Sequence, residues 1–582
     1  MRRGVLAVLA GILLVALASG CVRLPGSGPV VETRSEGDVS SDNGVSFDPM
    51  PPQPGATRTE IVRGFLIAMQ KTPIGTKVAR QFLTTDAAAS WNPQQETITY
   101  PLSPTPRESQ RGVTITLTDA DHLDSRGAWR GPLPKDRRTV TFSMSSEHGE
   151  WRIADLPDAL IVPEDWFQQY YRQVSLYFFD PTASILVPEP AFVPRGDQLA
   201  SALTQALLLG PSPGLERVAQ SFIPPGLEVS VGVTVSDDGV ADILLSGEVG
   251  QLTADTTEMM LAQLAWTLRQ EPAVRSIKLS ANGNPVPLPG GVSSYRVDGG
   301  AQFDPAGFQA SPLLYGLSHG GVISGTPTGL APVEGVLAGP GLGLTSIGVS
   351  LDAGSVAGIG ADGTAVLVGE LGVAGDTQVR TVVSGGQSFL EPAWDFSGRM
   401  WLVDRASRGA RVSYVQGTRV RPLDVPGVSG EQVRSFLVSR DGSRLVAVVH
   451  RKGGDQLVVS RIEHDGTGRV LGATRATRIG TGVDAPLPIR AIAWRSTTSV
   501  AVLNPPVTSS LASIGLASVD GSPSSQEPSS VTVEGRLIAL AGSPAGDEPV
   551  YGLTRAGLVD ISSSDQRVTP LPKGTTDLGY VG

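Results

Sequence analysis

Residues 439–449 read SRDGSRLVAVV, a polar turn with an Asp-Gly pair that leads directly into a run of apolar residues. The turn chemistry and the β-branched residues that follow predict a tight turn and a buried strand at 445–449. The same order recurs upstream, because Gly354, Gly398 and Gly442 are separated by 44 residues each time and each stands in a turn before an apolar segment. A repeat of about 45 residues built from short strands is typical of β-propeller blades.

The propeller is expected to occupy residues 293–582, which show strand patterns and almost no helical periodicity. LYGLSHGGV at 314–322 is echoed by VYGLTRAGL at 550–558, and Trp494 leads a further unit. At about 45 residues per blade, this region holds roughly six blades. The form Ser-x-Asp-Gly-x-x-Leu at 439–445 is similar to the repeat of TolB-type propellers.

Residues 173–292 are expected to form an α+β domain in the order strand, helix, strand, strand, helix, strand. The expected strands are 174–180, 229–235, 240–245 and 274–279, and the expected helices are 198–209 and a segment that begins at 255 and ends before Pro272. The segments LYF at 176–178, LLLGP at 207–211 and IPPG at 223–226 resemble the GerMN domain. This resemblance implies an envelope interaction module without established catalysis.

Residues 57–172 are expected to form a separate α+β domain. Thr57 and Glu60 form a capping box, and Ile61, Phe65 and Met69 follow at helical spacing. A second helix is expected at 77–83, and strands are expected at 113–117, 138–144 and 150–153. Helices followed by an antiparallel sheet are similar to the NTF2-like fold.

Four aromatic residues, Trp166, Phe167, Tyr170 and Tyr171, stand at helical spacing near the end of this first domain. They are interpreted either as a partner-binding stripe or as packing between the first and second domains. We favour packing, because the second domain begins immediately after them.

The N-terminus has the layout of a secretory signal peptide, residues 1–20. Arg2 and Arg3 are followed by an uncharged apolar run at 4–17, then by small residues and by Cys21, the single cysteine. Residues 18–21 resemble the lipobox of bacterial lipoproteins, which implies S-diacylglycerol and N-palmitoyl groups on Cys21. The alternative is an ordinary secretory signal with an incidental cysteine.

Residues 21–56 are expected to comprise the lipidated Cys21 and a flexible tether, because they are rich in Gly, Ser, Pro and Asp without apolar periodicity. Loss of residues 1–20 removes two arginines and changes the net charge from −10 to −12. An acidic chain without a basic stripe is unsuited to nucleic acid. No second apolar run approaches the length of a membrane span.

Three short patterns match catalytic or nucleotide-binding motifs in letters only. Gly316–Gly320 and Gly210–Gly214 match the Gly-x-Ser-x-Gly nucleophile elbow, and Gly358–Gly363 matches the dinucleotide pattern. Each is expected to be a hairpin turn or a loop, because a strand–turn–helix context is missing from the pattern around it. We therefore predict no catalytic residue and no cofactor.

The five histidines do not share metal-ligand spacing, so we predict no metal site and interpret each as a surface or loop residue. They are His122, His148, His319, His450 and His464. A glycosidase-type pair of carboxylates inside the propeller remains open.

The order of lipobox, tether, α+β domain, GerMN-like domain and propeller resembles the LpqB family of actinobacterial lipoproteins. The resemblance implies a protein that is lipid-anchored at the extracytoplasmic face of the cell membrane. It further implies a non-enzymatic adaptor that binds the extracytoplasmic domain of the sensor kinase MtrB and modulates the MtrAB two-component system, with effects on envelope homeostasis, growth and division.

Two alternatives stay open. In the first alternative, the central funnel of the propeller holds the site of an envelope hydrolase or of sugar binding. A cluster of carboxylates with shifted pKa values at the axis would favour this alternative. The GerMN-like domain is the place for direct binding of cell-wall peptidoglycan.

Overall fold

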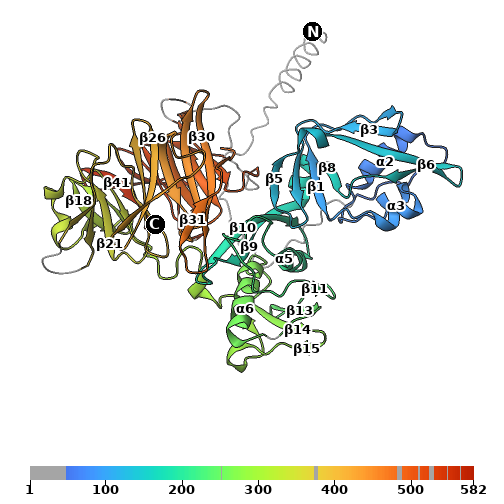
Figure 1. Cartoon of the computed structure of the whole chain (residues 1–582), viewed down its shortest axis with the longest axis horizontal. Helices are drawn as coiled ribbons and strands as arrows, with labels where there is room; N and C mark the ends of the chain where they lie inside the picture. Colours follow the sequence, from blue (N-terminus) through green and yellow to red (C-terminus); the bar gives the residue numbers. More distant parts are fainter. Residues whose placement is uncertain are drawn as a thin grey trace, which may run out of the picture. The chain divides into compact units, whose positions relative to one another are not determined.

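The computed structural model describes residues 47–250, 252–372, 378–481, 488–506, 508, 511–523, 530–546, 548–563 and 565–582. Predictions for the signal peptide, Cys21 and the tether up to residue 46 lie outside the described residues. The flexible tether expected at 21–56 is wrong for 47–56, because Phe47 bridges Thr72 and the Gly55 N–H donates to the Glu150 carboxylate at 2.9 Å. Two α+β parts and an all-β part follow one another along the described chain, which confirms the expected fold class (Figure 1).

The first helix of the described residues, α2 (Arg58–Ala68), begins where the capping box predicts. The Thr57 hydroxyl accepts a hydrogen bond from the Glu60 backbone N–H, and the Glu60 carboxylate accepts one from the Thr57 N–H at 2.8 Å. The predicted apolar stripe is buried, and the Phe65 ring lies 6.0 Å from that of Phe142 on the sheet behind it. The capped helix is therefore held on the sheet by its apolar face.

Two four-stranded sheets complete the first domain. One contains β5 (Trp129–Pro132), β4 (Asp121–Asp124), β1 (Glu96–Tyr100) and β8 (Leu160–Pro163), and the other contains β2 (Arg107–Ser109), β3 (Gly112–Thr116), β6 (Thr139–Glu147) and β7 (Glu150–Asp155). The expectation of an antiparallel sheet is wrong for β1 and β8, which pair in parallel.

The helix expected at 77–83 is also wrong. Only the 3-10 turn η1 (Ala79–Phe82) forms there, because Leu83 is extended and bridges Ile153. Thr84 then accepts a hydrogen bond from the Ala87 N–H and caps a short helix, α3 (Thr85–Ser90).

The second domain opens with a long antiparallel hairpin of β9 (Tyr171–Phe179) and β10 (Leu186–Pro194). Strand β10 was not predicted, because it contains Pro188, Pro190 and Pro194. The prolines and Phe192 occupy alternate positions of the strand, so their backbone nitrogens all face the same edge. The Phe192 N–H points away from β9 and donates to the Gly127 carbonyl at 2.8 Å. The prolines therefore remove donors only from the edge that faces away from β9.

The remainder of the second domain packs two helices, α5 (Leu199–Leu208) and α6 (Ala254–Leu268), against a second sheet. Its strands are β11 (Glu228–Val229), β12 (Thr234–Val235), β13 (Val240–Ser246), β14 (Ser276–Ala281), β15 (Asn284–Pro285) and β16 (Tyr295–Arg296). The single strand expected at 229–235 is wrong. Two short strands, β11 and β12, each pair with β13, and Val231 between them is 65% exposed.

Six sheets form the propeller. They contain β41 (Thr575–Gly579), β17 (Leu314–Ser318), β18 (Gly321–Gly325) and β19 (Ala331–Pro332) in blade one; β20 (Ser346–Val349), β21 (Ser355–Ile359), β22 (Val366–Glu370) and β23 (Arg380–Val383) in blade two; and β24 (Ala393–Trp394), β25 (Met400–Ala406), β26 (Gly409–Gln416) and β27 (Arg419–Leu423) in blade three.

The other three blades have the same order of strands. They contain β28 (Gln432–Val438), β29 (Arg444–Arg451), β30 (Gly454–His464), β31 (Val470–Ala473) and β32 (Thr477–Arg478) in blade four; β33 (Ala491–Ser496), β34 (Ser499–Leu503), β35 (Leu511–Ser518) and β36 (Ser530–Glu534) in blade five; and β37 (Ala539–Ala541), β38 (Tyr551–Leu553), β39 (Gly557–Asp560) and β40 (Val568–Pro570) in blade six.

The ring closes through β41, which pairs antiparallel with β17 and so completes blade one. The innermost strands then contact each other in the order β41, β20, β24, β28, β33, β37 and back to β41. The expected number of about six blades is confirmed for the described residues.

The repeats found in the sequence correspond to equivalent places in the blades. Gly354, Gly398 and Gly442 stand in the turns between the first and second strands of blades two, three and four. The echoing segments 314–322 and 550–558 are the hairpins of the second and third strands in blades one and six. The period of 44 residues therefore measures the blade repeat.

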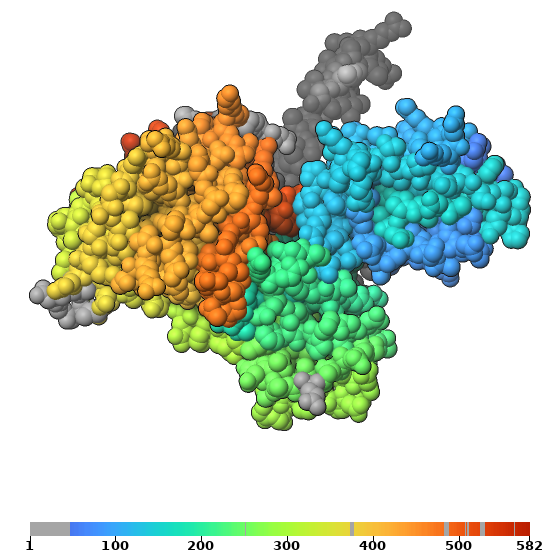
Figure 2. Space-filling model, in the orientation of Figure 1, coloured from blue at the N-terminus to red at the C-terminus, as the bar shows by residue number. Residues whose placement is uncertain are grey.

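The second domain contacts the propeller, where green and orange surfaces meet in Figure 2, and the hairpin β9–β10 is part of this contact. Glu189 on β10 pairs with two propeller arginines, at 2.9 Å to Arg444 and 2.6 Å to Arg461. Gln173 on β9 donates to the hydroxyls of Ser518 and Ser522, both at 2.9 Å. We call this contact region the seam.

The aromatic residues at the end of the first domain pack against the same hairpin. Helix α4 (Glu164–Tyr170) buries Trp166 and Phe167, and the Phe167 ring lies 5.2 Å from that of Phe192 on β10 and 4.6 Å from that of Tyr171. This confirms their interpretation as packing between the first and second domains.

Closure of the ring predicts that Leu578 on β41 matters for stability. Its side chain is 5% exposed and packs with Leu314, Leu553 and Leu558. Leu578→Ala is expected to lower the free energy of unfolding by about 2–5 kcal/mol, because it opens a cavity in the core. Thermal unfolding of the full chain tests this, with Thr576→Ala on the exposed side of β41 as the control. Equal melting temperatures for both variants would contradict it.

The seam predicts a large effect of Glu189→Gln. Arg444 is 0% exposed and loses its shorter carboxylate contact in this variant, since Asp441 lies at 3.6 Å. We expect a loss of about 3 kcal/mol or more, because a fully buried charge is left poorly compensated. Limited proteolysis and thermal unfolding measure this, with the exposed Glu228→Gln in the same domain as control. Wild-type protease resistance of Glu189→Gln would refute the assignment.

Candidate functional site

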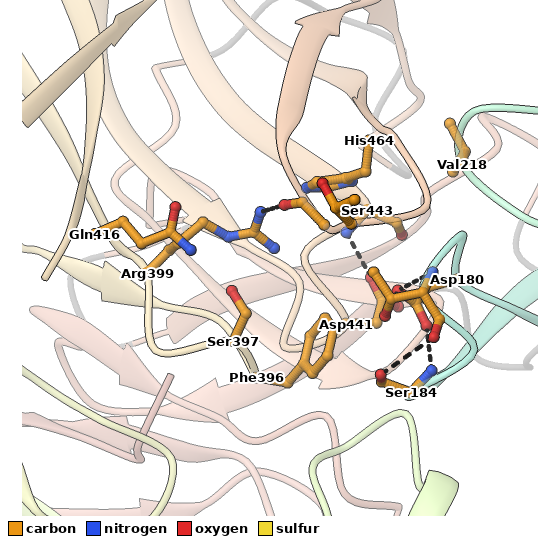
Figure 3. Close-up of a pocket in the computed structure, with 13 residues that line it drawn as sticks. Asp180, Ser184, Val218, Phe396, Ser397, Arg399, Gln416, Asp441, Ser443 and His464 are labelled. Atoms are coloured by element: carbon orange, nitrogen blue, oxygen red, sulfur yellow. Dashed lines mark hydrogen bonds between the residues drawn. The ribbon is translucent and has the colours of Figure 1, made fainter.

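A cavity of about 250 Å³ lies in the seam, between the end of the β9–β10 hairpin and blades three and four (Figure 3). Its lining residues are mostly polar, and four of them come from the second domain. They are Asp180, Thr182, Ser184, Val218, Phe396, Ser397, Arg399, Gln416, Asp441, Ser443, His464, Thr467 and Gly468.

Asp180 organises the wall that the second domain contributes. One carboxylate oxygen accepts from the N–H groups of Ser184 at 2.8 Å and Ile185 at 3.1 Å, and the other accepts from the Thr182 N–H at 3.0 Å and from its hydroxyl. Because both oxygens are engaged by the hairpin loop itself, Asp180 shapes this wall and has little capacity to act as a base.

A buried ion pair forms the opposite wall. The Asp395 carboxylate accepts from Arg399 Nε at 2.8 Å and from Trp401 Nε1 at 2.9 Å, and Arg399 Nη1 donates to the Gly468 carbonyl at 2.8 Å. Asp395 and Arg399 are each 1% exposed. The pair is neutral as a unit, so this wall adds hydrogen-bonding groups to the cavity without net charge.

His464 stands apart from the other histidines. It is 7% exposed, so its interpretation as a surface or loop residue is wrong. Burial, followed by the nearby Arg399 guanidinium, lowers the pKa of His464 to about 4. Its Nε2 atom has no hydrogen-bond partner among the described residues. The imidazole is therefore neutral at neutral pH and keeps hydrogen-bonding capacity at the cavity.

The remaining histidines lie in separate places. His122 contacts Glu96 at 2.7 Å, His450 contacts Asp455 at 2.7 Å, and His148 and His319 occupy turns with positive φ. Across the described ranges, no group of three or more His, Cys, Asp or Glu side chains is arranged to hold a metal ion.

A pair of carboxyl groups lies close to the propeller axis. Asp577 lies on β41, the innermost strand of blade one, and accepts from the Ile347 N–H at 2.9 Å. Glu391 lies two residues before β24, the innermost strand of blade three. Burial raises the pKa of Asp577 to about 6, and burial together with the Asp577 charge raises that of Glu391. This is the kind of perturbed pair that the hydrolase alternative requires.

The three catalytic-looking patterns are turns or loops, as expected. Gly316–Gly320 spans the hairpin of β17 and β18, and its Ser318 hydroxyl donates to the Lys573 carbonyl at 2.9 Å. Gly210–Gly214 is the loop after α5, and Gly358–Gly363 leads through a hairpin from β21 into β22. None of these segments has the strand–turn–helix context that its motif needs.

Sequence reasoning missed the charged side chains of the seam. DFSGR at 395–399 and DGTGR at 465–469 place an arginine four residues after an aspartate, and both pairs form, at 2.8 and 3.1 Å. This repeated spacing was a usable signal. No local pattern indicates Glu189, because its partner Arg444 lies 255 residues further along the chain.

Comparison with protein-family models finds three matches. "Lipoprotein LpqB, N-terminal domain" matches residues 51–168, "Sporulation and spore germination" matches 175–287, and "Lipoprotein LpqB beta-propeller domain" matches 320–577. In the part of the chain that the structure describes, no helix has the length and apolar character needed to cross a bilayer.

Similar relatives carry the name Lipoprotein LpqB. The protein of Streptomyces coelicolor is 27% identical, with 89% of each chain covered, and that of Thermobifida fusca is 28% identical, with 78% of this chain and 80% of its own covered. The protein of Streptomyces avermitilis is 26% identical over 96% of this chain and 95% of its own. The domain matches in this order, together with relatives aligned over most of the chain, show that it belongs to the LpqB family of lipoproteins.

Proposed function

We propose that this chain is a non-enzymatic adaptor, anchored through lipid on Cys21 at the extracytoplasmic face of the cell membrane. It binds the extracytoplasmic domain of the sensor kinase MtrB and modulates the MtrAB system, with effects on envelope homeostasis, growth and division. The observation that carries the proposal is the seam, since buried Glu189–arginine contacts join the GerMN-like domain and the propeller into one body.

The seam occupies one face of the propeller and leaves the loops of the other face for a partner. Turns between first and second strands, such as Ser439–Ser443 before β29, carry side chains of the seam cavity. Turns between second and third strands lie at the opposite end of each antiparallel blade. Three of these turns bear an exposed cation, namely Arg408, Lys452 and Arg555. Loops held on a rigid scaffold suit recognition, and these favour an acidic partner surface.

Attachment to the bilayer supports the same function through concentration. A lipid on Cys21 with a tether of about 25 residues before Phe47 keeps the propeller near a membrane receptor, which raises the effective concentration without new contacts. An adaptor of this kind shifts signalling only if it binds two states of the kinase with different affinity.

In-cell photo-crosslinking tests the proposal on the full-length protein. A photoreactive residue at Lys452 is expected to capture the MtrB ectodomain, whereas one at the exposed Lys278 of the second domain serves as the matched control. Cys21→Ala is expected to move the protein off the membrane and to reduce capture at Lys452. Capture of wall enzymes without the kinase, or membrane attachment of Cys21→Ala that equals wild type, would contradict it.

A second candidate function is envelope glycan hydrolysis at the propeller axis, which the Glu391–Asp577 pair favours. Glycoside cleavage by acid–base chemistry needs one protonated and one ionised carboxyl group, and the raised pKa of Glu391 beside Asp577 suits the role of the acid. Under this candidate, purified wild-type protein releases sugars from cell wall and Glu391→Gln does not. Equal release, or none, from both proteins would exclude it.

The same pair predicts a pH-dependent stability. The folded pKa of Asp577 is about 6 against an ordinary value of 3.8, so the folded chain holds more protons between these values. The contribution of Asp577 to the free energy of unfolding therefore falls as pH rises through this window. At neutral pH the destabilisation by the ionised carboxylate is fully present. Asp577→Asn, which keeps an oxygen for the Ile347 N–H, is expected to raise the melting temperature at neutral pH and to flatten this dependence.

The control for this test is Asp362→Asn, since Asp362 is exposed and hydrogen bonds from Thr364 lower its pKa. It is expected to give no gain in melting temperature at neutral pH. If Asp577→Asn also gives no gain in melting temperature, ionised Asp577 does not destabilise the fold at neutral pH and the prediction is wrong.

A further inference from the structure

A second, larger cavity of about 520 Å³ lies in the seam at the other end of the hairpin, between β9 and blade five. It differs from the first cavity in its charge, because two arginines, Arg172 and Arg195, line it and no lining residue is acidic. The remaining walls are mainly hydroxyl and amide groups, including Ser496, Thr498, Ser499 and Gln270. The cavity therefore offers hydrogen-bond donors and positive charge together.

Arg172 is the residue that calls for a ligand. It is partly buried, and its guanidinium forms no hydrogen bond or ion pair with any residue that the structure describes. No guanidinium nitrogen of Arg172 is among the fully buried atoms without a partner, so the group is open to a molecule that enters the cavity. Because no carboxylate lies in the cavity wall, an anion from outside the chain can pair with it without displacing a partner.

The walls around Arg172 are held in place. Gln270 on the α6 side accepts from the Ser175 N–H at 2.8 Å and donates to the Ser175 carbonyl at 2.7 Å. Ser496 and Ser499 share a hydrogen bond of 2.7 Å, and Arg195 Nε donates to the Tyr171 carbonyl at 2.8 Å. The cavity is thus preorganised, and a ligand would order few groups on binding.

We propose that this cavity binds a phosphate ester of a polyol, with Arg172 on the phosphate oxygens and the Ser, Thr and Gln groups on the hydroxyls. A guanidinium matches the geometry of an oxyanion with two parallel N–H donors. The volume exceeds what inorganic phosphate fills and has room for an attached polyol. A lipid headgroup and a phosphate-bearing wall polymer both present this chemistry. The proposal is independent of the adaptor function, because it needs no protein partner.

Binding at this place would also strengthen the seam. The ligand would contact β9 of the second domain and blade five of the propeller at once, and a ligand that binds only the folded, joined form stabilises that form by mass action. The melting temperature is therefore expected to rise with ligand concentration.

Isothermal titration of the full-length protein with sn-glycerol 3-phosphate tests the proposal. Wild type is expected to bind, with affinity that falls as salt is added. Arg172→Gln is expected to weaken binding about tenfold or more, because a charge-assisted hydrogen bond is lost, and Arg172→Lys is expected to retain part of it. The matched control is Arg419→Gln, an exposed arginine on β27 away from the cavity.

Several outcomes overturn the proposal. They are the absence of heat and of a melting shift for wild type, equal binding by Arg172→Gln, or equal binding of glycerol or of acetate in place of the phosphate ester. Unchanged melting of Arg172→Gln without ligand shows that the variant is folded. Unlipidated Cys21→Ala protein added to phosphatidylglycerol vesicles separates the sources. If the protein floats with the vesicles and Arg172→Gln does not, the ligand is a lipid headgroup. If the protein binds soluble glycerol phosphate but not the vesicles, the ligand is a wall polymer or a free phosphate ester.

Discussion

Pairing of β41 with β17 is the contact on which the propeller depends. A blade sheet buries its two faces only against neighbouring blades, so an open ring would leave two sheets half exposed. The chain satisfies this by placing its last strand innermost in the first blade, where Leu578 joins side chains from blades one and six. Every inner strand then has a neighbour on both sides.

The two junctions of the second domain use different physics. On the side of the first domain, Phe167 and Phe192 pack as apolar rings, which contributes through burial and tolerates small shifts. On the side of the propeller, Glu189 and Arg444 are charged and mostly buried, and two polar cavities lie beside them. A charged contact of this kind fixes one geometry and loses much of its energy when either partner moves. The seam is thus the more sharply defined joint.

Much of the fold could be predicted because it rests on local patterns. The Thr57–Glu60 cap and the glycine turns at 354, 398 and 442 are decided by neighbouring residues, and they stand where the sequence indicates. Strand β10 escaped prediction because its prolines argue against a strand unless one edge is known to be unpaired. The charged seam escaped because Glu189 and Arg444 are 255 residues apart and lie in different domains.

The same prolines have a consequence for how this protein behaves among copies of itself. A nine-residue strand at the edge of a two-stranded sheet is a template on which another chain can add. With Pro188, Pro190 and Pro194 on the outward edge and the Phe192 amide already bound to Gly127, that edge has few donors left to offer. Sheet-to-sheet polymerisation along this hairpin is thereby suppressed without any charged gatekeeper on the strand's outer edge.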